Sequence, residues 1–211
     1  MKIQKKTLSN GLRALFIELP DSKTVTVEVL VRTGSLDEKE HNQGISHFLE
    51  HMCFKGTTNR PTAMDISREL ESLGAHSNAY TSHNHTAYYA KSASVHAGKL
   101  LDVIADIYLH STFPEFEIQK EKGVIVEEIN MYKDQPDSLV DEEWNKIFFK
   151  TGSMSRPIIG TKESVLRMTR KDFVEYHKKY YVPENTVVVV SGSFDQKKMF
   201  EDIKKYFSKI P

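Results

Sequence analysis

The tightest restriction on how this 211-residue chain can fold comes from residues 47–51, which read His-Phe-Leu-Glu-His. His47 and His51 are four residues apart, so on a helix they lie one above the other on the same face. The apolar residues of segment 43–54 recur at helical spacing; they are Ile45, Phe48, Leu49 and Met52. We therefore predict a helix that is buried on one side and presents two imidazoles and the Glu50 carboxylate on the other.

Two imidazoles in this arrangement can bind one Zn²⁺ ion. Glu50 is one turn from His47, beside the same face, so its carboxylate can reach a metal-bound water. The order H-x-x-E-H reverses the usual zinc peptidase pattern and occurs in inverzincins. The alternative is a helix that packs two histidines and binds no metal.

A catalytic zinc site needs a third protein ligand and an open position for water. The best source is segment 121–129, which lies in a long predicted helix at 114–132. Glu121 and Glu128 are seven residues apart and share a helix face, whereas Glu127 is turned roughly 100° from Glu128. The neighbours of Glu128 are apolar, and a carboxylate there needs a charge partner. The residues alone leave Glu127 and Glu128 both open as the ligand, and a solvated acidic face as the alternative.

The rest of the chain alternates irregularly between strand-like and helix-like segments. Strands are predicted at 2–8 and 12–19, around an Asn-Gly turn, and at 24–32, 75–81, 85–92 and 186–191. Further helices are predicted at 62–73, 95–110, 138–149, 162–168, 170–180 and 196–207. This order is not a regular βαβ alternation, and it favours an α+β fold in which helices cover a largely antiparallel sheet. We expect residues 1–211 to form a single domain.

Composition excludes several classes of protein. Lys plus Arg and Asp plus Glu both number 29, and the zero net charge argues against a nucleic-acid-binding protein. The single cysteine, Cys53, excludes an internal disulfide and any multi-cysteine metal site. No apolar run is long enough to span a membrane, and no secretory signal is present. The expected location is cytoplasmic, although a matrix or periplasmic protein without its leader would look the same.

The histidine motif, 76 intervening residues and then Glu128 resemble the signature of the pitrilysin/insulinase family of zinc peptidases. The similarity runs over nearly the whole chain, and the surrounding motifs resemble its bacterial processing-protease branch. Those motifs are Arg32-Thr33-Gly34-Ser35, residues 44–52, Phe54-Lys55-Gly56-Thr57, Leu73-Gly74-Ala75, Asn78-Ala79-Tyr80-Thr81 and Glu128-Ile129-x-Met131-Tyr132.

The resemblance implies the fold of the pitrilysin and mitochondrial-processing-peptidase domains, and it implies a role for each site residue. His47, His51 and Glu128 would be the ligands of one zinc ion per chain, and Glu50 the general base. Glu121 matches a second acidic position of the family, which supports the site, for example by orienting a ligand histidine.

The resemblance also implies a substrate class. Asn78, Ala79 and Tyr80 match an edge strand to which an extended substrate adds by backbone pairing; an ordinary edge strand is the alternative. The implied activity is a zinc-dependent endopeptidase that cleaves extended or unfolded peptides. Glu50 would take a proton from the attacking water and pass it to the leaving amine.

Length separates this chain from the usual family member, which has a second, similar domain that closes over the site. The chain resembles only the N-terminal, metal-bearing half. The alternative function is therefore a non-catalytic or partner-dependent subunit or fragment. It would need a second domain, supplied by a partner chain or through a homo-oligomer.

A second enzyme hypothesis is a protein similar to S-ribosylhomocysteine lyase. Enzymes of that class also have an H-x-x-E-H helix, but they take a cysteine as the third metal ligand. Cys53 lies about 200° around the helix from His51, so we interpret it as a core residue. His76, His83 and His85 could form a second metal site, but we expect them to be surface turn histidines.

Overall fold

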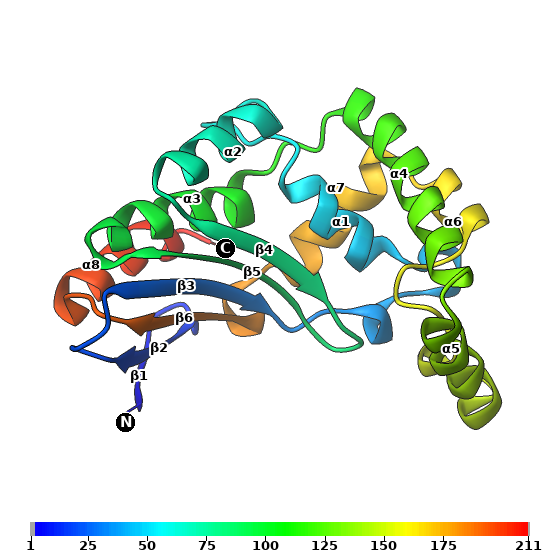
Figure 1. Cartoon of the computed structure of the whole chain (residues 1–211), viewed down its shortest axis with the longest axis horizontal. Helices are drawn as coiled ribbons and strands as arrows, with labels where there is room; N and C mark the ends of the chain where they lie inside the picture. The colour runs from blue at the N-terminus through cyan, green and yellow to red at the C-terminus, as the bar shows by residue number, and fades with distance from the viewer. Residues whose placement is uncertain (1–2, 211) are drawn as a thin grey trace.

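The computed structural model describes residues 3–210, and its strands form one six-stranded sheet in the order β1-β2-β6-β3-β5-β4 (Figure 1). The strands are β1 (Ile3–Thr7), β2 (Arg13–Glu18), β3 (Thr24–Val31), β4 (His76–Thr81), β5 (Thr86–Ala93) and β6 (Thr186–Gly192). Neighbouring strands are antiparallel except for β2 and β6, which are parallel. The predicted largely antiparallel sheet is confirmed.

The described residues also form eight α-helices. They are α1 (Ile45–Cys53), α2 (Ala63–Ser72), α3 (Ala97–His110), α4 (Glu115–Lys133), α5 (Pro136–Phe149), α6 (Lys162–Arg167), α7 (Arg170–Tyr180) and α8 (Gln196–Phe207). Short 3-10 turns occupy Ser35–Asp37, Glu40–Asn42, Ser94–His96, Ser153–Ser155 and Pro183–Asn185. Helices α3 and α8 lie over the sheet, whereas α1, α4, α6 and α7 gather beyond the end of β4 and β5 (Figure 1). None of the helices in residues 3–210 is both long and apolar enough to cross a lipid bilayer.

One part of the hydrophobic core lies between the sheet and helices α3 and α8, and the same cluster continues through buried residues of α1, α2, α4 and α7. The alternating valines of β3 all point into it and are at most 1% exposed; they are Val25, Val27, Val29 and Val31. Residues of α3, such as Leu100 and Ile104, are fully buried against this face. The period of two in β3 therefore sets which face of the sheet receives the helices.

Every element predicted from the sequence is present, with bounds that shift by about two residues at most. Lys2, the first residue of the predicted opening strand, lies outside the described residues, as do Met1 and Pro211 at the ends of the predicted domain. The sequence did not predict that β6 lies between β2 and β3 and runs parallel to β2. Its valine run indicates burial on both faces but carries no information about its neighbours.

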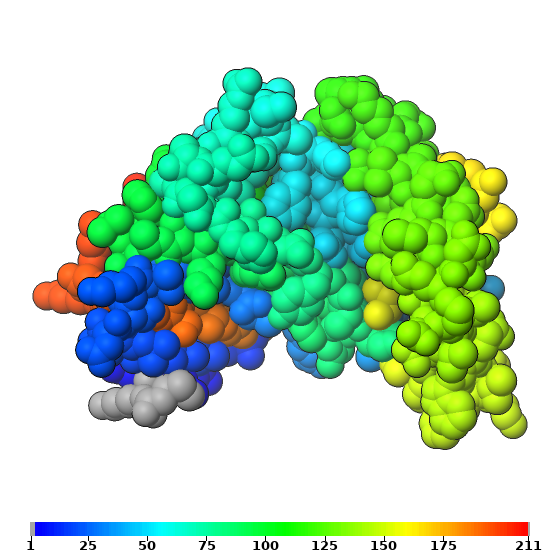
Figure 2. All heavy atoms as spheres, viewed as in Figure 1, coloured from blue at the N-terminus to red at the C-terminus, as the bar shows by residue number. Residues whose placement is uncertain are grey.

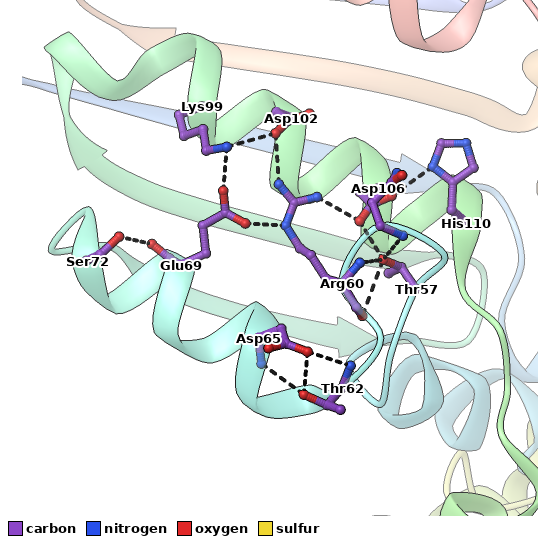
Figure 3. A network of polar contacts seen from close by, with 11 residues as sticks. Thr57, Arg60, Thr62, Asp65, Glu69, Ser72, Lys99, Asp102, Asp106 and His110 are labelled. Carbon is purple, nitrogen blue, oxygen red and sulfur yellow. Dashed lines mark hydrogen bonds and ion pairs between the residues drawn. The ribbon is translucent and has the colours of Figure 1, made fainter.

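A buried ion network joins the loop after α1 to helices α2 and α3 (Figure 3). The side chain of Arg60 is only 9% exposed and bonds Glu69 on α2 and two aspartates on α3. Its Nη2 is 2.8 Å from Asp102, and its Nη1 is 2.7 Å from Asp106. Asp106 also accepts a hydrogen bond from Thr57 at 2.5 Å. The loop that leaves α1 is thus held to two helices through one guanidinium group.

We expect Arg60→Ala to lower the free energy of unfolding by about 3 kcal/mol, because it leaves the buried Asp106 carboxylate without its cation. Urea denaturation measures this loss. The control is Lys146→Ala, which removes a cation from Glu142 and Glu143 on the exposed helix α5 and should cost at most about 0.5 kcal/mol. Equal losses in the two variants would contradict a special role for the buried network.

Candidate metal centre

Helix α1 has the two sides that its sequence predicts. Ile45, Phe48, Leu49 and Met52 are fully buried, whereas His47, Glu50 and His51 are only partly buried. The helix packs against β4, α4 and α7. Figure 2 shows it at the bottom of a hollow, between the part of the chain that holds α2 and β4 and the part that holds α4. The polar side of α1 therefore faces a solvent-accessible space.

The structure brings His47, His51 and Glu128 together, with one potential ligand atom from each within 4.8 Å of the others. The Nε2 atoms of His47 and His51 lie 3.7 and 3.6 Å from the two carboxylate oxygens of Glu128. These distances are too long for hydrogen bonds. Ligands bound at 2.0–2.2 Å in a tetrahedral zinc site are about 3.4 Å apart, so the two histidine–carboxylate distances are within a few tenths of an ångström of the spacing that such an ion requires. Glu127, the neighbouring candidate, is exposed on another face of α4.

The two histidines differ in their surroundings. Burial, reinforced by the neighbouring His51, lowers the pKa of His47 to about 3. The ring is therefore neutral at ordinary pH and has a lone pair free for a metal. Burial also lowers the pKa of His51, but its hydrogen bond to Glu121 and the charges of Glu128, Glu121 and Glu50 outweigh this, and its pKa is raised overall. Acidic groups thus favour a positive charge at this point of the site.

Glu121 contacts His51 on the side of the ring that faces away from Glu128. Its Oε1 is 2.9 Å from His51 Nδ1, and its Oε2 is 2.6 Å from the ammonium group of Lys55. Burial raises the pKa of Glu121, but the bonds to His51 and Lys55 lower it below the ordinary value. An ionised Glu121 accepts a hydrogen bond from the Nδ1–H group of His51 and leaves the lone pair of Nε2 free to bind a metal. Lys55 lies one turn after His51, but its pairing with Glu121 was not predicted from the sequence.

Glu50, on the polar side of α1, faces the same hollow and contacts strand β4. Burial raises the pKa of its carboxyl group, although the Thr81 hydroxyl, which donates to Oε2 at 2.5 Å, opposes the rise. Thr81 is the last residue of β4 and was not predicted to touch the site. Tyr132, one turn after Glu128, was also given no role. Together with His47 it lines a cavity of about 330 Å³ on the other side of the centre.

Strand β4 forms one edge of the sheet and pairs only with β5 within residues 3–210. Asn78 and Ala79 line a groove of about 220 Å³ together with Glu50 and His51. The Ala79 N–H donates to the Asn78 side chain at 2.9 Å, so that bond must open before a peptide pairs there. The Tyr80 hydroxyl donates to Glu28 on β3 at 3.0 Å, so this side chain lies across the sheet.

The remaining candidates are not members of this converging group, although His83 lines the same cavity of about 330 Å³ as His47. His76, expected in a surface turn, is the first residue of strand β4 and is exposed. Cys53 is fully buried, and burial raises the pKa of its thiol to about 12, as expected for a core residue. His83 pairs with Ser35, and His85 with Ser82, each at 2.8 Å. Among residues 3–210, His47, His51 and Glu128 are the one group of three such side chains that converges on a common point.

Comparison with known proteins places this geometry in a family. The model of the insulinase family, peptidase family M16, matches residues 13–162, which include every residue of the centre. The model of the peptidase M16 inactive domain matches residues 167–211.

Two relatives and one solved structure show how far the similarity extends. An uncharacterised zinc protease of Bacillus subtilis, YmxG, is 39% identical over 205 residues, which are 97% of this chain and 50% of that protein. The beta subunit of the mitochondrial-processing peptidase of Neurospora crassa is 35% identical over 211 residues, or 100% of this chain and 44% of that protein. A Helicobacter pylori protease of known structure is 30% identical, with a TM-score of 0.91 over 99% of this chain and 50% of that one.

The chain thus spans about half the length of the relatives it matches. One family model covers well over half of the chain, and it includes both histidines of α1 and the glutamates of α4. This chain belongs to the insulinase family of peptidases, family M16.

Proposed function

We propose that His47, His51 and Glu128 hold one zinc ion, and that Glu50 is the general base of a peptide-bond hydrolysis carried out at this centre. The observation that carries the proposal is the convergence of His47, His51 and Glu128 beside the partly buried Glu50: each imidazole Nε2 lies 3.6–3.7 Å from an oxygen of the Glu128 carboxylate, and the three groups lie within 4.8 Å of one another. The names of relatives as zinc proteases support the choice of metal.

A zinc ion held by His47, His51 and Glu128 would supply Lewis-acid chemistry: it would make water a nucleophile near neutral pH and polarise a substrate carbonyl. Residues of this chain would transfer the proton and orient the groups that take part. Glu50 accepts the proton of the attacking water and delivers it to the leaving amine. The Thr81 hydroxyl holds Oε2 of Glu50 and leaves Oε1 to exchange the proton. Glu121 fixes the orientation and tautomer of His51 through Nδ1.

The substrate in this proposal is an extended peptide that pairs with the free edge of β4. Backbone pairing at Asn78, Ala79 and Tyr80 depends little on side-chain identity, so it suits unfolded segments of varied sequence. Thr81 continues the same strand and bonds Glu50. A peptide along this edge would therefore pass directly beside the proposed general base.

A second candidate is a subunit or half-protein that binds the metal but needs another domain for hydrolysis. It is favoured by the half-length match to relatives and by the open hollow over α1 (Figure 2). The missing surface would come from a second domain, a partner chain or another copy of this chain. Zinc content, measured alongside cleavage of a quenched fluorescent peptide with and without chelator, separates the candidates. One zinc with chelator-sensitive cleavage supports the first, and one zinc without cleavage supports the second.

Glu128→Ala should abolish stoichiometric zinc binding, because it removes one of three protein ligands. Glu127→Ala is the matched control: it removes a neighbouring carboxylate that is exposed on another helix face, and it should leave about one zinc per chain. Metal analysis of the two purified proteins is the measurement. If the control lost the metal and Glu128→Ala kept it, the ligand assignment on α4 would be wrong.

Glu50→Gln should keep zinc and lose peptide hydrolysis, because it removes the proton acceptor and leaves all three proposed ligands intact. A general base contributes about 10²–10⁴-fold to rate, so turnover should fall at least a hundredfold. The assay compares zinc-loaded variant and wild-type protein in whichever assembly is active. Wild-type turnover by the loaded variant would exclude Glu50 as the base.

A further inference from the structure

Helix α1 begins without a capping side chain of its own. Its N-cap residue is Gly44, whose positive φ of 84° suits glycine, and no side chain at that position can cap the helix. A Cβ at Gly44 would lie 2.4 Å from the carbonyl oxygen of Ile159. The backbone of a distant loop therefore packs directly against the start of α1, and it leaves no room for the usual Ser, Thr, Asp or Asn cap.

Glu38 supplies the missing acceptor from six residues earlier in the chain. Its Oε2 accepts the N–H of Gly44 at 2.7 Å, and its Oε1 accepts the N–H of Ser46 at 2.9 Å. The residue is 6% exposed. A carboxylate at this end of a helix is also stabilised by the positive end of the helix dipole. Both oxygens of this buried side chain are thus committed to the first turn of α1.

Two further contacts hold the same turn. Arg156 donates from Nη2 to the backbone carbonyl of Glu38 at 2.8 Å, which ties Glu38 to the loop that carries Ile159. The Ser46 hydroxyl is 2.8 Å from the hydroxyl of Tyr176, which in turn is 2.8 Å from Thr33. Glu38 therefore belongs to a set of polar groups that together fix the start of α1.

The first turn of α1 matters because His47 directly follows Ser46. The Nδ1 atom of His47 is buried and has no hydrogen-bond partner among the described residues, in contrast to the bond between His51 and Glu121. No carboxylate therefore orients the His47 ring, and its position depends on packing and on the backbone of this turn.

We propose that Glu38 is a positioning residue for the metal centre: its carboxylate caps α1 through Gly44 and Ser46 and so holds the His47 ring in place for the metal. The inference rests on the proposed zinc site. Glu38 would thus position His47, as Glu121 positions His51. The two histidines are then held by different devices, one through the backbone and one through the ring.

The test is Glu38→Gln, which keeps the size of the side chain but replaces one acceptor oxygen with an amide that cannot accept an N–H. We expect zinc affinity, measured by chelator competition on the full chain, to fall about tenfold, the lower end of the effect of removing groups that support metal ligands. Amide exchange at Gly44 and Ser46 should become faster. Glu38→Asp keeps the charge but reaches less far, so it should lose less affinity; it also serves if Glu38→Gln fails to fold.

The matched control is Asp195→Ala, which removes the side-chain cap of α8, a bond of 3.0 Å to the Lys198 N–H. It should lower Tm by about 2–4 °C and leave zinc affinity unchanged. A Glu38→Gln protein that loses Tm in the same way but binds zinc like the wild type would overturn the positioning role. A wild-type protein that binds no zinc would instead overturn the proposed function, and with it the role of Glu38 toward the metal.

Discussion

The candidate metal centre depends on the packing of one short helix. Helix α1 has nine residues, and an isolated helix of that length is not stable in water. It persists because Ile45, Phe48, Leu49 and Met52 are buried against the sheet and the helices around it. Because that face is buried, His47, Glu50 and His51 on the other face point toward the hollow. One nine-residue segment therefore specifies both the core contact and the polar side.

The groups that surround α1 come from distant parts of the chain. Glu121 and Glu128 arrive on α4, Thr81 on β4, and the backbone of Ile159 on the loop after α5. Each contact restricts a different part of the helix: the first turn, the proposed base, or the second histidine. The buried network around Arg60 holds the loop that leaves α1. The helix is therefore fixed at both ends as well as along its buried face.

Among residues 3–210, the hollow over α1 is bordered by the edge of β4 that pairs with no other strand and by α4, and no other described segment covers it (Figure 2). An open site gives the proposed base access to solvent as well as to peptide, whereas hydrolytic sites gain from exclusion of bulk water. The half-length match to relatives agrees with a centre that is built on this chain and enclosed by another surface.

The sequence by itself determined the secondary structure, the α+β class and the two-sided character of α1, because all of these follow from local periodicity. It also reduced the third ligand to Glu127 or Glu128 on the basis of helix geometry, and the family resemblance favoured Glu128. It did not give the place of β6 in the sheet, the contact of Thr81 with Glu50, the pairing of Lys55 with Glu121, or the cap that Glu38 provides. The first three depend on segments that meet across 30 or more residues of chain, and local sequence patterns do not record such contacts. Glu38 is only six residues from Gly44, but its role as a cap depends on the backbone of Ile159, which packs against Gly44 from a distant loop. Only tertiary packing decides them, because it alone brings α4, β4 and the loop at Ile159 to the same short helix.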